Sequence, residues 1–183
     1  MPATRATGNA DRYNSMSIWL HWLMLALIAG AYASIELREF YPRGSDMREA
    51  FKNWHYWLGL AVLLLVWLRI AARLVWKAPA PVERGWRNLA SKATHGALYV
   101  LMIAMPLAGW AILSAEGDPV SFFGLRLPAL VAQDRPLAET LEEIHELGGT
   151  IGYWLIGLHA AAALFHHYVL RDSLLARMAP GRA

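Results

Sequence analysis

Residues 144–168 read IHELGGTIGYWLIGLHAAAALFHHY, a largely apolar stretch that holds four of the seven histidines of the chain. Its length and composition predict a helix that crosses a lipid bilayer, because about 20 apolar residues span about 30 Å of hydrocarbon. Ionisable side chains are costly inside a membrane and usually mark a functional site. This one stretch therefore indicates both the class of protein and the place where its chemistry occurs.

The whole chain has the composition of an integral membrane protein. Of its 183 residues, 57% are hydrophobic and 17% are charged, whereas a soluble domain carries about 25% charged residues. The apolar residues gather in four blocks long enough to be transmembrane helices: 16–35, 54–76, 93–114 and 147–170. We therefore predict an all-α integral membrane protein, an antiparallel up-and-down four-helix transmembrane bundle that forms a single domain over residues 1–183. Helical spacing from Leu137 predicts that the last helix extends beyond the bilayer.

The distribution of lysine and arginine predicts which way the bundle faces. Eleven of these residues lie in the N-terminal tail, the 69–92 link and the C-terminal tail, and six lie in the connections 36–53 and 115–144. Basic residues concentrate on the cytoplasmic side of membrane proteins. Both termini are therefore expected to be cytoplasmic, with the two connections outside.

Two histidines of the last block lie on one helix face at two depths. His145 and His159 are 14 residues apart, which returns to within about 40° of the same face and separates them by about 21 Å along the axis. His55 begins the second block level with His145, and His21 lies in the first block level with His159. The pairs His55–His145 and His21–His159 are therefore expected to hold two stacked cofactors. Two b-type haems fit, because haem iron takes axial imidazoles on opposite faces of its ring.

Glycines near these histidines favour a large flat ligand. Gly59 lies one turn after His55, and three more follow His145 within two turns: Gly148, Gly149 and Gly152. Because glycine lacks a side chain, a ring could approach the helix backbone at these positions. The chain has no cysteine, which excludes iron–sulfur clusters and c-type haem attached through C-x-x-C-H.

Other interpretations of the histidines remain open. A single intramembrane histidine can simply form a hydrogen bond across a helix interface, although four at matched depths favour cofactors. A metalloprotease is disfavoured because HELGG at 145–149 lacks the second histidine of H-E-x-x-H, and a di-iron site because no acid lies in the middle of a block. His95 is the rival of His21 as inner ligand, but we expect it to be too shallow to face His159.

The chain resembles the bacterial di-haem cytochrome b561 family from about residue 13 onward. The segments that carry this resemblance are SIWLHWL, IELREFYPRG, HGALYVLMIAMPLAG, GDPVSFFGL and IGYWLIGLHAAAALFHHY. The resemblance implies a multi-pass protein of the bacterial inner membrane with two haem b per chain. The axial ligands of the haem iron would be His21, His55, His145 and His159, which leaves His95 outside the ligand set.

Within that family the resemblance is greatest to the superoxide-oxidising branch. It implies an oxidoreductase that passes electrons from periplasmic superoxide through two haems to ubiquinone. The alternative is a cytochrome b subunit that relays electrons between quinone and a partner dehydrogenase or hydrogenase, and a histidine-rich transporter without redox activity is a third hypothesis. The lipid bilayer is an expected partner in each case, and no nucleic acid is expected.

Each substrate has candidate residues at one end of the predicted bundle. Quinone reduction takes up two protons, and His95 and His166 lie at the cytoplasmic depth from which to supply or orient them. Superoxide is an anion, so we expect a local basic funnel at the outer end even though that side is net acidic. Its principal candidates lie between the first two blocks: Arg43, Arg48 and Lys52, with Arg38 and Arg126 nearby.

Overall fold

Four long helices dominate the computed structural model, which describes residues 12–76, 78–81 and 85–180. They are α1 (Ser15–Arg38), α2 (Asp46–Val75), α3 (Trp86–Glu116) and α4 (Arg135–Phe165). Each is long and apolar enough to cross a membrane, which confirms the predicted four-helix membrane protein. Part of the predicted charge bias lies outside the described residues, at Arg5, Lys77, Arg84 and Arg182.

Three of the helices begin well before the apolar blocks that predicted them. At the start of α2, the Ser45 side chain accepts a hydrogen bond from the amide of Arg48. At the start of α4, the Asp134 side chain accepts one from the amide of Leu137. Such N-caps satisfy backbone donors that have no partner within the helix. The expected extension of the last helix is confirmed, because α4 already begins at Arg135.

The connection between α3 and α4 contains a small β-hairpin that the all-α prediction did not include. Strand β1 (Ser121–Phe122) pairs antiparallel with strand β2 (Leu125–Arg126). The two residues between them, Phe123 and Gly124, have positive φ angles of 48° and 82°, as a tight two-residue hairpin turn requires. A carbonyl of β1 accepts a hydrogen bond from the Trp57 indole at 3.2 Å, so the hairpin lies against α2.

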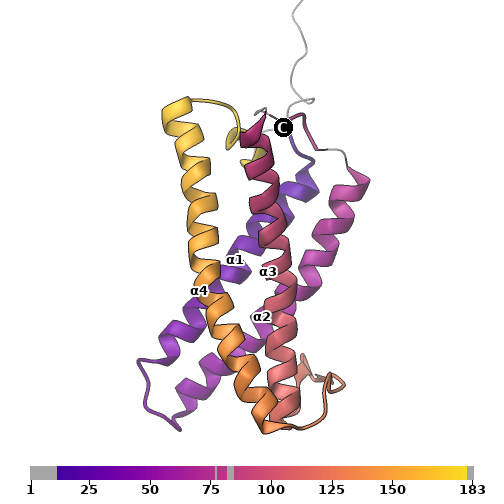
Figure 1. Cartoon of the computed structure of the whole chain (residues 1–183), viewed down its shortest axis with the longest axis vertical. Coiled ribbons are helices and arrows are strands. Elements are labelled where there is room, and N and C mark those ends of the chain that lie inside the picture. Colours follow the sequence, from indigo (N-terminus) through magenta and orange to yellow (C-terminus); the bar gives the residue numbers. More distant parts are fainter. Residues whose placement is uncertain (1–11, 77, 82–84, 181–183) are drawn as a thin grey trace, which may run out of the picture.

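Consecutive helices alternate in direction and pack against one another, so the predicted up-and-down topology is confirmed. Figure 1 shows α3 and α4 running along the long axis of the molecule, while α1 and α2 cross behind them. We call "proximal" the end where α1 and α3 begin and where α2 and α4 end. The opposite, "distal" end carries the α1–α2 connection and the hairpin.

Little of the apolar surface is buried inside the protein. Two clusters of buried side chains join the helices: Met24, Val62, Val66 and Met102 in one, and Leu60, Leu113 and Val120 in the other. Elsewhere large apolar side chains point outward, such as Trp154, which is 78% exposed, and Leu74, which is 82% exposed. A soluble protein rarely exposes apolar surface on this scale, and a lipid bilayer would cover it.

At its proximal end, α4 continues into one wider, π-helical turn over His166–Leu170. The chain then folds back as a C-terminal tail, residues 171–180, along the proximal end of the bundle. The Trp22 indole of α1 donates a hydrogen bond to the carbonyl of Met178 at 2.7 Å, and Arg177 donates one to the α2–α3 link at 2.7 Å. These contacts hold the tail in place beside the end of α4.

Candidate functional site

Two pairs of histidines meet within the bundle, one toward each end. His55 of α2 faces His145 of α4 with ring centroids 6.1 Å apart and ring planes at 77°. His21 of α1 faces His159 of α4 with centroids 6.3 Å apart and planes at 75°. These are the pairs expected from depth, and α4 supplies one ring to each.

The separation within each pair suits a metal ion held between two imidazoles. A metal–nitrogen bond is about 2 Å long and the ring centre lies about 1 Å beyond the nitrogen, so two rings on opposite sides of one metal have centroids about 6 Å apart. Both pairs have this spacing. The residues therefore fit two haem irons, each of which would be held by the two imidazoles of one pair.

The hydrogen bonds of the distal pair are also those of a ligand site. Nδ1 of His55 donates to the carbonyl of Ala31 at 2.9 Å, which leaves Nε2 free to bind a metal, as in most histidine ligands. Nδ1 of His145 is buried and makes no hydrogen bond of good geometry among the described residues, although the backbone of Met105 lies close enough to interact with the ring. A buried polar atom left unsatisfied by protein is expected where a further group completes the site.

Three imidazoles, rather than two, gather at the proximal pair. His95 of α3 lies with its ring centroid 5.3 Å from that of His159. The expectation that His95 is too shallow to face His159 was therefore wrong, because α3 begins at Trp86 and already carries His95 more than two turns into the helix. The ring spacing still favours His21 as the partner of His159. The His95–His159 distance of 5.3 Å is shorter than the centroid distance of about 6 Å that two opposed ligands of one metal require.

Arg69 of α2 is a candidate site residue that sequence reasoning missed. Its Nη2 donates to Nδ1 of His21 at 3.0 Å and its Nε to the hydroxyl of Tyr99 at 3.2 Å. Its Nη1 is buried and has no partner among the described residues. A buried guanidinium with a free donor suits a carboxylate, such as a haem propionate. The available signal was an arginine inside an apolar block, which we had counted only toward orientation.

The four glycines near His55 and His145 fall into two groups, according to the space that an added side chain would find. A side chain added at Gly59 or Gly149 would meet no atom within 4 Å, as expected where a flat ligand approaches the backbone. A side chain at Gly148 or Gly152 would instead run into neighbouring side chains. At Gly152 that neighbour is Tyr32, whose hydroxyl donates to the carbonyl of Gly149 at 2.8 Å.

Two tyrosines link α1 to α4 in the distal half of the bundle. The rings of Tyr32 and Tyr153 lie 4.2 Å apart, and the Tyr153 hydroxyl donates to a carboxylate oxygen of Glu36 at 2.8 Å. Sequence reasoning missed this contact because helix periodicity places a residue on a face but does not identify the residue opposite it.

The two candidates for quinone binding have different neighbours. His95 lies against His159 and donates through Nδ1 to the carbonyl of Ser91 at 2.6 Å. His166 instead contacts the carboxylate of Asp172 in the C-terminal tail, with Nδ1 and Oδ2 2.5 Å apart. Burial alone would raise the pKa of Asp172, but the hydrogen bond from His166 outweighs burial and the net pKa is lowered.

Arg48, a candidate for guiding superoxide, is committed to the structure of the α1–α2 connection. Its Nη1 donates to the carbonyls of Arg38 and Tyr41 at 3.1 and 3.0 Å, and its Nη2 donates to both carboxylate oxygens of Glu39. Only 13% of its side chain is exposed. Hydrogen bonds from Arg48 and Arg38 in turn hold the pKa of Glu39 below its ordinary value. The charge of Arg48 is therefore already paired.

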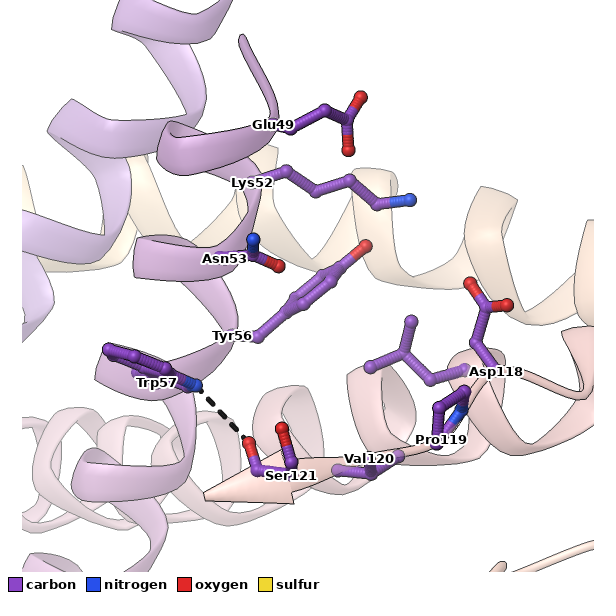
Figure 2. A pocket seen from close by; sticks show the side chains of 10 residues that line it. Glu49, Lys52, Asn53, Tyr56, Trp57, Asp118, Pro119, Val120 and Ser121 are labelled. Atoms are coloured by element: carbon purple, nitrogen blue, oxygen red, sulfur yellow. Dashed lines mark hydrogen bonds between the residues drawn. The ribbon is translucent and has the colours of Figure 1, made fainter. Parts of the chain in front are cut away.

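Lys52 lines a polar pocket of about 270 Å³ at the distal end, between α2, the end of α3 and strand β1 (Figure 2). Its ammonium group lies 5.6 Å from the centre of the Tyr56 ring. The carboxylates of Glu49 and Asp118 also line the pocket. Arg43 is exposed and is not among the lining residues. The three candidate cations thus do not share one basic funnel.

Comparison with known proteins agrees with this arrangement. The model of the prokaryotic cytochrome b561 family matches residues 12–181. Cytochrome b561 homolog 1 of Escherichia coli is 35% identical over 94% of this chain and 99% of its own length. A probable superoxide oxidase, CybB of Yersinia pestis, is 40% identical over 92% of this chain and 96% of its own. Cytochrome b562 of Cereibacter sphaeroides is 30% identical over 91% and 94%, respectively.

These relatives are matched along nearly their entire lengths, so the likeness covers the bundle and all four histidines of the two pairs. Membership implies a membrane electron-transfer protein with haem b as its cofactor. The chain belongs to the prokaryotic cytochrome b561 family.

Proposed function

We propose that the protein is a di-haem superoxide:ubiquinone oxidoreductase of the bacterial inner membrane. The observation that carries this proposal is the presence of two histidine pairs at two depths of one bundle, with ring separations of 6.1 and 6.3 Å. His55 and His145 would hold a distal haem b, and His21 and His159 a proximal one. Bound haem b supplies one-electron chemistry, because its iron alternates between the ferric and ferrous states. The name of the Yersinia relative supports superoxide as the electron donor.

The two substrates would react at opposite ends of the molecule. The bias of basic residues supports a cytoplasmic proximal end and a periplasmic distal end. Two superoxide ions would give up one electron each and leave as dioxygen at the distal end. One ubiquinone would take up these two electrons and two protons at the proximal end and leave as ubiquinol. His95 and His166, both on the proximal side, are the residues proposed to orient quinone or supply its protons.

The remaining residues of the two sites would hold and shield the cofactors. The Ala31 carbonyl fixes the ring orientation of His55, and Arg69 offers a buried donor to a carboxylate beside the proximal pair. Apolar side chains between the two pairs, such as Met24 and Val66, would help to exclude water from this part of the bundle. Exclusion of water lowers the local dielectric constant, which strengthens the field of the Arg69 guanidinium on any negative charge nearby.

A second candidate function is that of a relay subunit, which would exchange electrons between quinone and a partner dehydrogenase. The distal charges favour this alternative, because Arg48 is paired with Glu39 and Lys52 lies in a pocket with two carboxylates. An end of this kind is less suited to collect a small anion than a basic funnel would be.

Rapid mixing of the purified oxidised protein with superoxide separates the two functions. A superoxide oxidase should show reduction of its haem absorption bands within the mixing experiment, followed by ubiquinol formation when ubiquinone is present. A protein whose haems stay oxidised in superoxide but become reduced by ubiquinol would be a relay subunit. The absence of haem b bands from the reduced-minus-oxidised spectrum would exclude both functions.

A further inference from the structure

The C-terminal tail brings a carboxylate against His166, the first of the two histidines in the π-helical turn. We propose that Asp172 is a positioning residue that orients His166 and balances its charge while His166 passes protons to quinone. This inference rests on the proposed function and assigns a role to a residue that the sequence patterns did not single out. It is carried by the local backbone geometry, the contact of the two side chains and the limited exposure of both.

The backbone between the two residues is built to bring them together. The α-helical hydrogen-bond pattern ends at Phe165, and the turn from His166 to Leu170 is wider than an α-helical turn. Such π-helical turns often occur at functional sites. Arg171 then has a positive φ of 54°, and the amide of Asp172 donates to the carbonyl of His166 at 3.2 Å. The chain therefore reverses within one turn and places residue 172 beside the His166 ring.

The carboxylate is itself fixed in place. One oxygen, Oδ1, accepts a hydrogen bond from the amide of Leu174 at 2.9 Å, and the other, Oδ2, faces Nδ1 of His166. Arg177 is the charged residue of the tail that also acts on Asp172, and its attraction lowers the pKa of this carboxyl further. Asp172 therefore remains ionised at neutral pH.

This contact fixes the role of one nitrogen of His166. Nδ1 donates its proton to Asp172, so proton exchange between the ring and a bound ligand would take place at Nε2. A carboxylate in this position fixes the orientation of the ring, as aspartate does in other histidine dyads. The side chains of His166 and Asp172 are only 12% and 21% exposed, so the pair is partly shielded from solvent.

The protons and electrons balance as follows. The proposed function supplies two electrons from two superoxide ions to one ubiquinone. As one quinone oxygen gains an O–H bond, the Nε2–H bond of His166 breaks, and the ring then takes a new proton from water at the proximal surface; the other quinone oxygen takes its proton from water. Asp172 keeps its negative charge throughout and forms no bond to the substrate.

The test compares two electron acceptors on the intact haem-loaded protein. The protein is reduced with dithionite, freed of excess reductant and mixed rapidly with either a short-chain ubiquinone or ferricyanide. Ferricyanide accepts an electron without a proton, so only the quinone reaction should depend on the dyad. The variants are Asp172→Asn, Asp172→Ala and His166→Gln, with His167→Gln as a control because His167 is the exposed neighbour in the same turn.

We expect Asp172→Asn to slow haem reoxidation by saturating ubiquinone about tenfold or more, with little change in the quinone concentration at half-saturation. Reoxidation by ferricyanide should be unchanged, and His167→Gln should behave like the wild type with both acceptors. Adding Asp172→Asn to His166→Gln should slow the quinone reaction no further, because Asp172 acts through that histidine. If Asp172→Ala does not fold, Asp172→Asn alone decides the test, since it keeps a side-chain oxygen at the same place.

Two results would overturn this inference. One is quinone reduction at the wild-type rate in Asp172→Asn, and the other is an equal loss with both acceptors, which would make Asp172 a structural residue only. A wild-type protein that ferricyanide reoxidises but ubiquinone does not would remove the proposed function and this inference together. Failure of the inference alone is therefore distinguishable from failure of the proposed function.

Discussion

Nδ1 of His55 lies 2.9 Å from the carbonyl oxygen of Ala31, so the backbone of α1 orients a ring that belongs to α2. This hydrogen bond leaves Nε2 of His55 free toward His145 of α4. Three helices thus cooperate at the distal pair, and the orienting group is a main-chain atom. Substitution of Ala31 by another small residue would preserve the distal pair, whereas loss of either imidazole would not.

The first prediction concerns haem content. His55→Ala or His145→Ala should reduce the haem b released by acidified solvent from two per chain to about one, because a haem held by one imidazole is lost more readily. The remaining haem should keep its spectrum and its midpoint potential, since the second pair is separate. Pyridine haemochrome assay and redox titration measure the two quantities. Loss of both haems from a folded protein would contradict independent sites.

The second prediction separates the two rivals at the proximal pair. His21→Ala should remove the proximal haem, whereas His95→Ala should retain both haems, because the His21 ring has the spacing of an opposed ligand and the His95 ring is too close. The control is His167→Ala, which removes an exposed imidazole from the same end. Two haems in His21→Ala together with one in His95→Ala would make His95 the ligand.

The pairing of the histidines could be predicted from sequence because depth in a membrane helix follows directly from residue number. A rise of about 1.5 Å per residue and alternating helix directions place His55 level with His145 and His21 level with His159. The same reasoning failed for His95, because the polar first turns of α3 lie outside the apolar block and the helix start was placed seven residues too late.

Contacts that depend on the ends of helices could not be predicted. The interaction of Asp172 with His166 requires a π-helical turn and a positive φ at Arg171, and neither has a sequence signature as strong as hydrophobic periodicity. Likewise, Arg48 looks in the sequence like any exposed basic residue, and only the path of the α1–α2 connection gives it two carbonyls to bind. The sequence alone does not distinguish an arginine whose charge is paired from one whose charge is free.

The third prediction concerns the close contact of α1 and α4 at Gly152. Gly152→Ala places a methyl group against the Tyr32 hydroxyl, and overpacking of this kind costs about 1–3 kcal/mol. Better helix propensity offsets only about 0.5–1 kcal/mol of that cost, so the apparent melting temperature in detergent should fall. Gly157→Ala, an exposed position in the same helix where nothing lies within 4 Å, is the matched control and should not lower it.

Removal of the Tyr32 hydroxyl should relieve this clash. The double variant Tyr32→Phe with Gly152→Ala is therefore expected to be more stable than Gly152→Ala alone, once the effect of Tyr32→Phe by itself is subtracted. Additive effects of the two substitutions would show that the methyl group and the hydroxyl do not meet.

The fourth prediction concerns the pH dependence of the α1–α2 connection. The pKa of Glu39 is lowered by its hydrogen bonds to Arg48 and Arg38, so the unfolded chain binds more protons than the folded one near the ordinary glutamate pKa of about 4.3. The stabilising contribution is therefore complete above that pKa and is lost as the pH falls through the lowered value. Glu39→Gln should lack this part of the acid dependence, measured as melting temperature from pH 7 downward.

Arg48→Met should destabilise the protein at all these pH values. It removes the side-chain donor of the Tyr41 carbonyl and one of the two donors of the Arg38 carbonyl, which also accepts from the amide of Tyr41, at a cost of about 1–3 kcal/mol. The control is Arg43→Met, an exposed residue in the same connection, which should have little effect. Equal melting temperatures for Arg48→Met and the wild type would show that water replaces the guanidinium without loss.

The last prediction concerns electrostatic guidance of superoxide at the distal end. Because Arg48 is paired and holds the connection, guidance is expected from the other two candidates, Arg43 and Lys52. Attraction of an anion by these charges should make haem reduction by superoxide faster at low salt and slower as salt screens the field. Arg43→Glu combined with Lys52→Glu should slow this step about threefold or more at low ionic strength, and should remove most of its salt dependence. Haem spectra should stay as in the wild type, since neither residue belongs to a histidine pair. Lys92→Glu, a charge reversal at an exposed position of α3 near the proximal end, is the control and should leave the rate unaltered.

A rate that responds neither to salt nor to the double reversal would show that superoxide is not guided by these charges, and would strengthen the case for a relay subunit that receives its electrons from a protein partner.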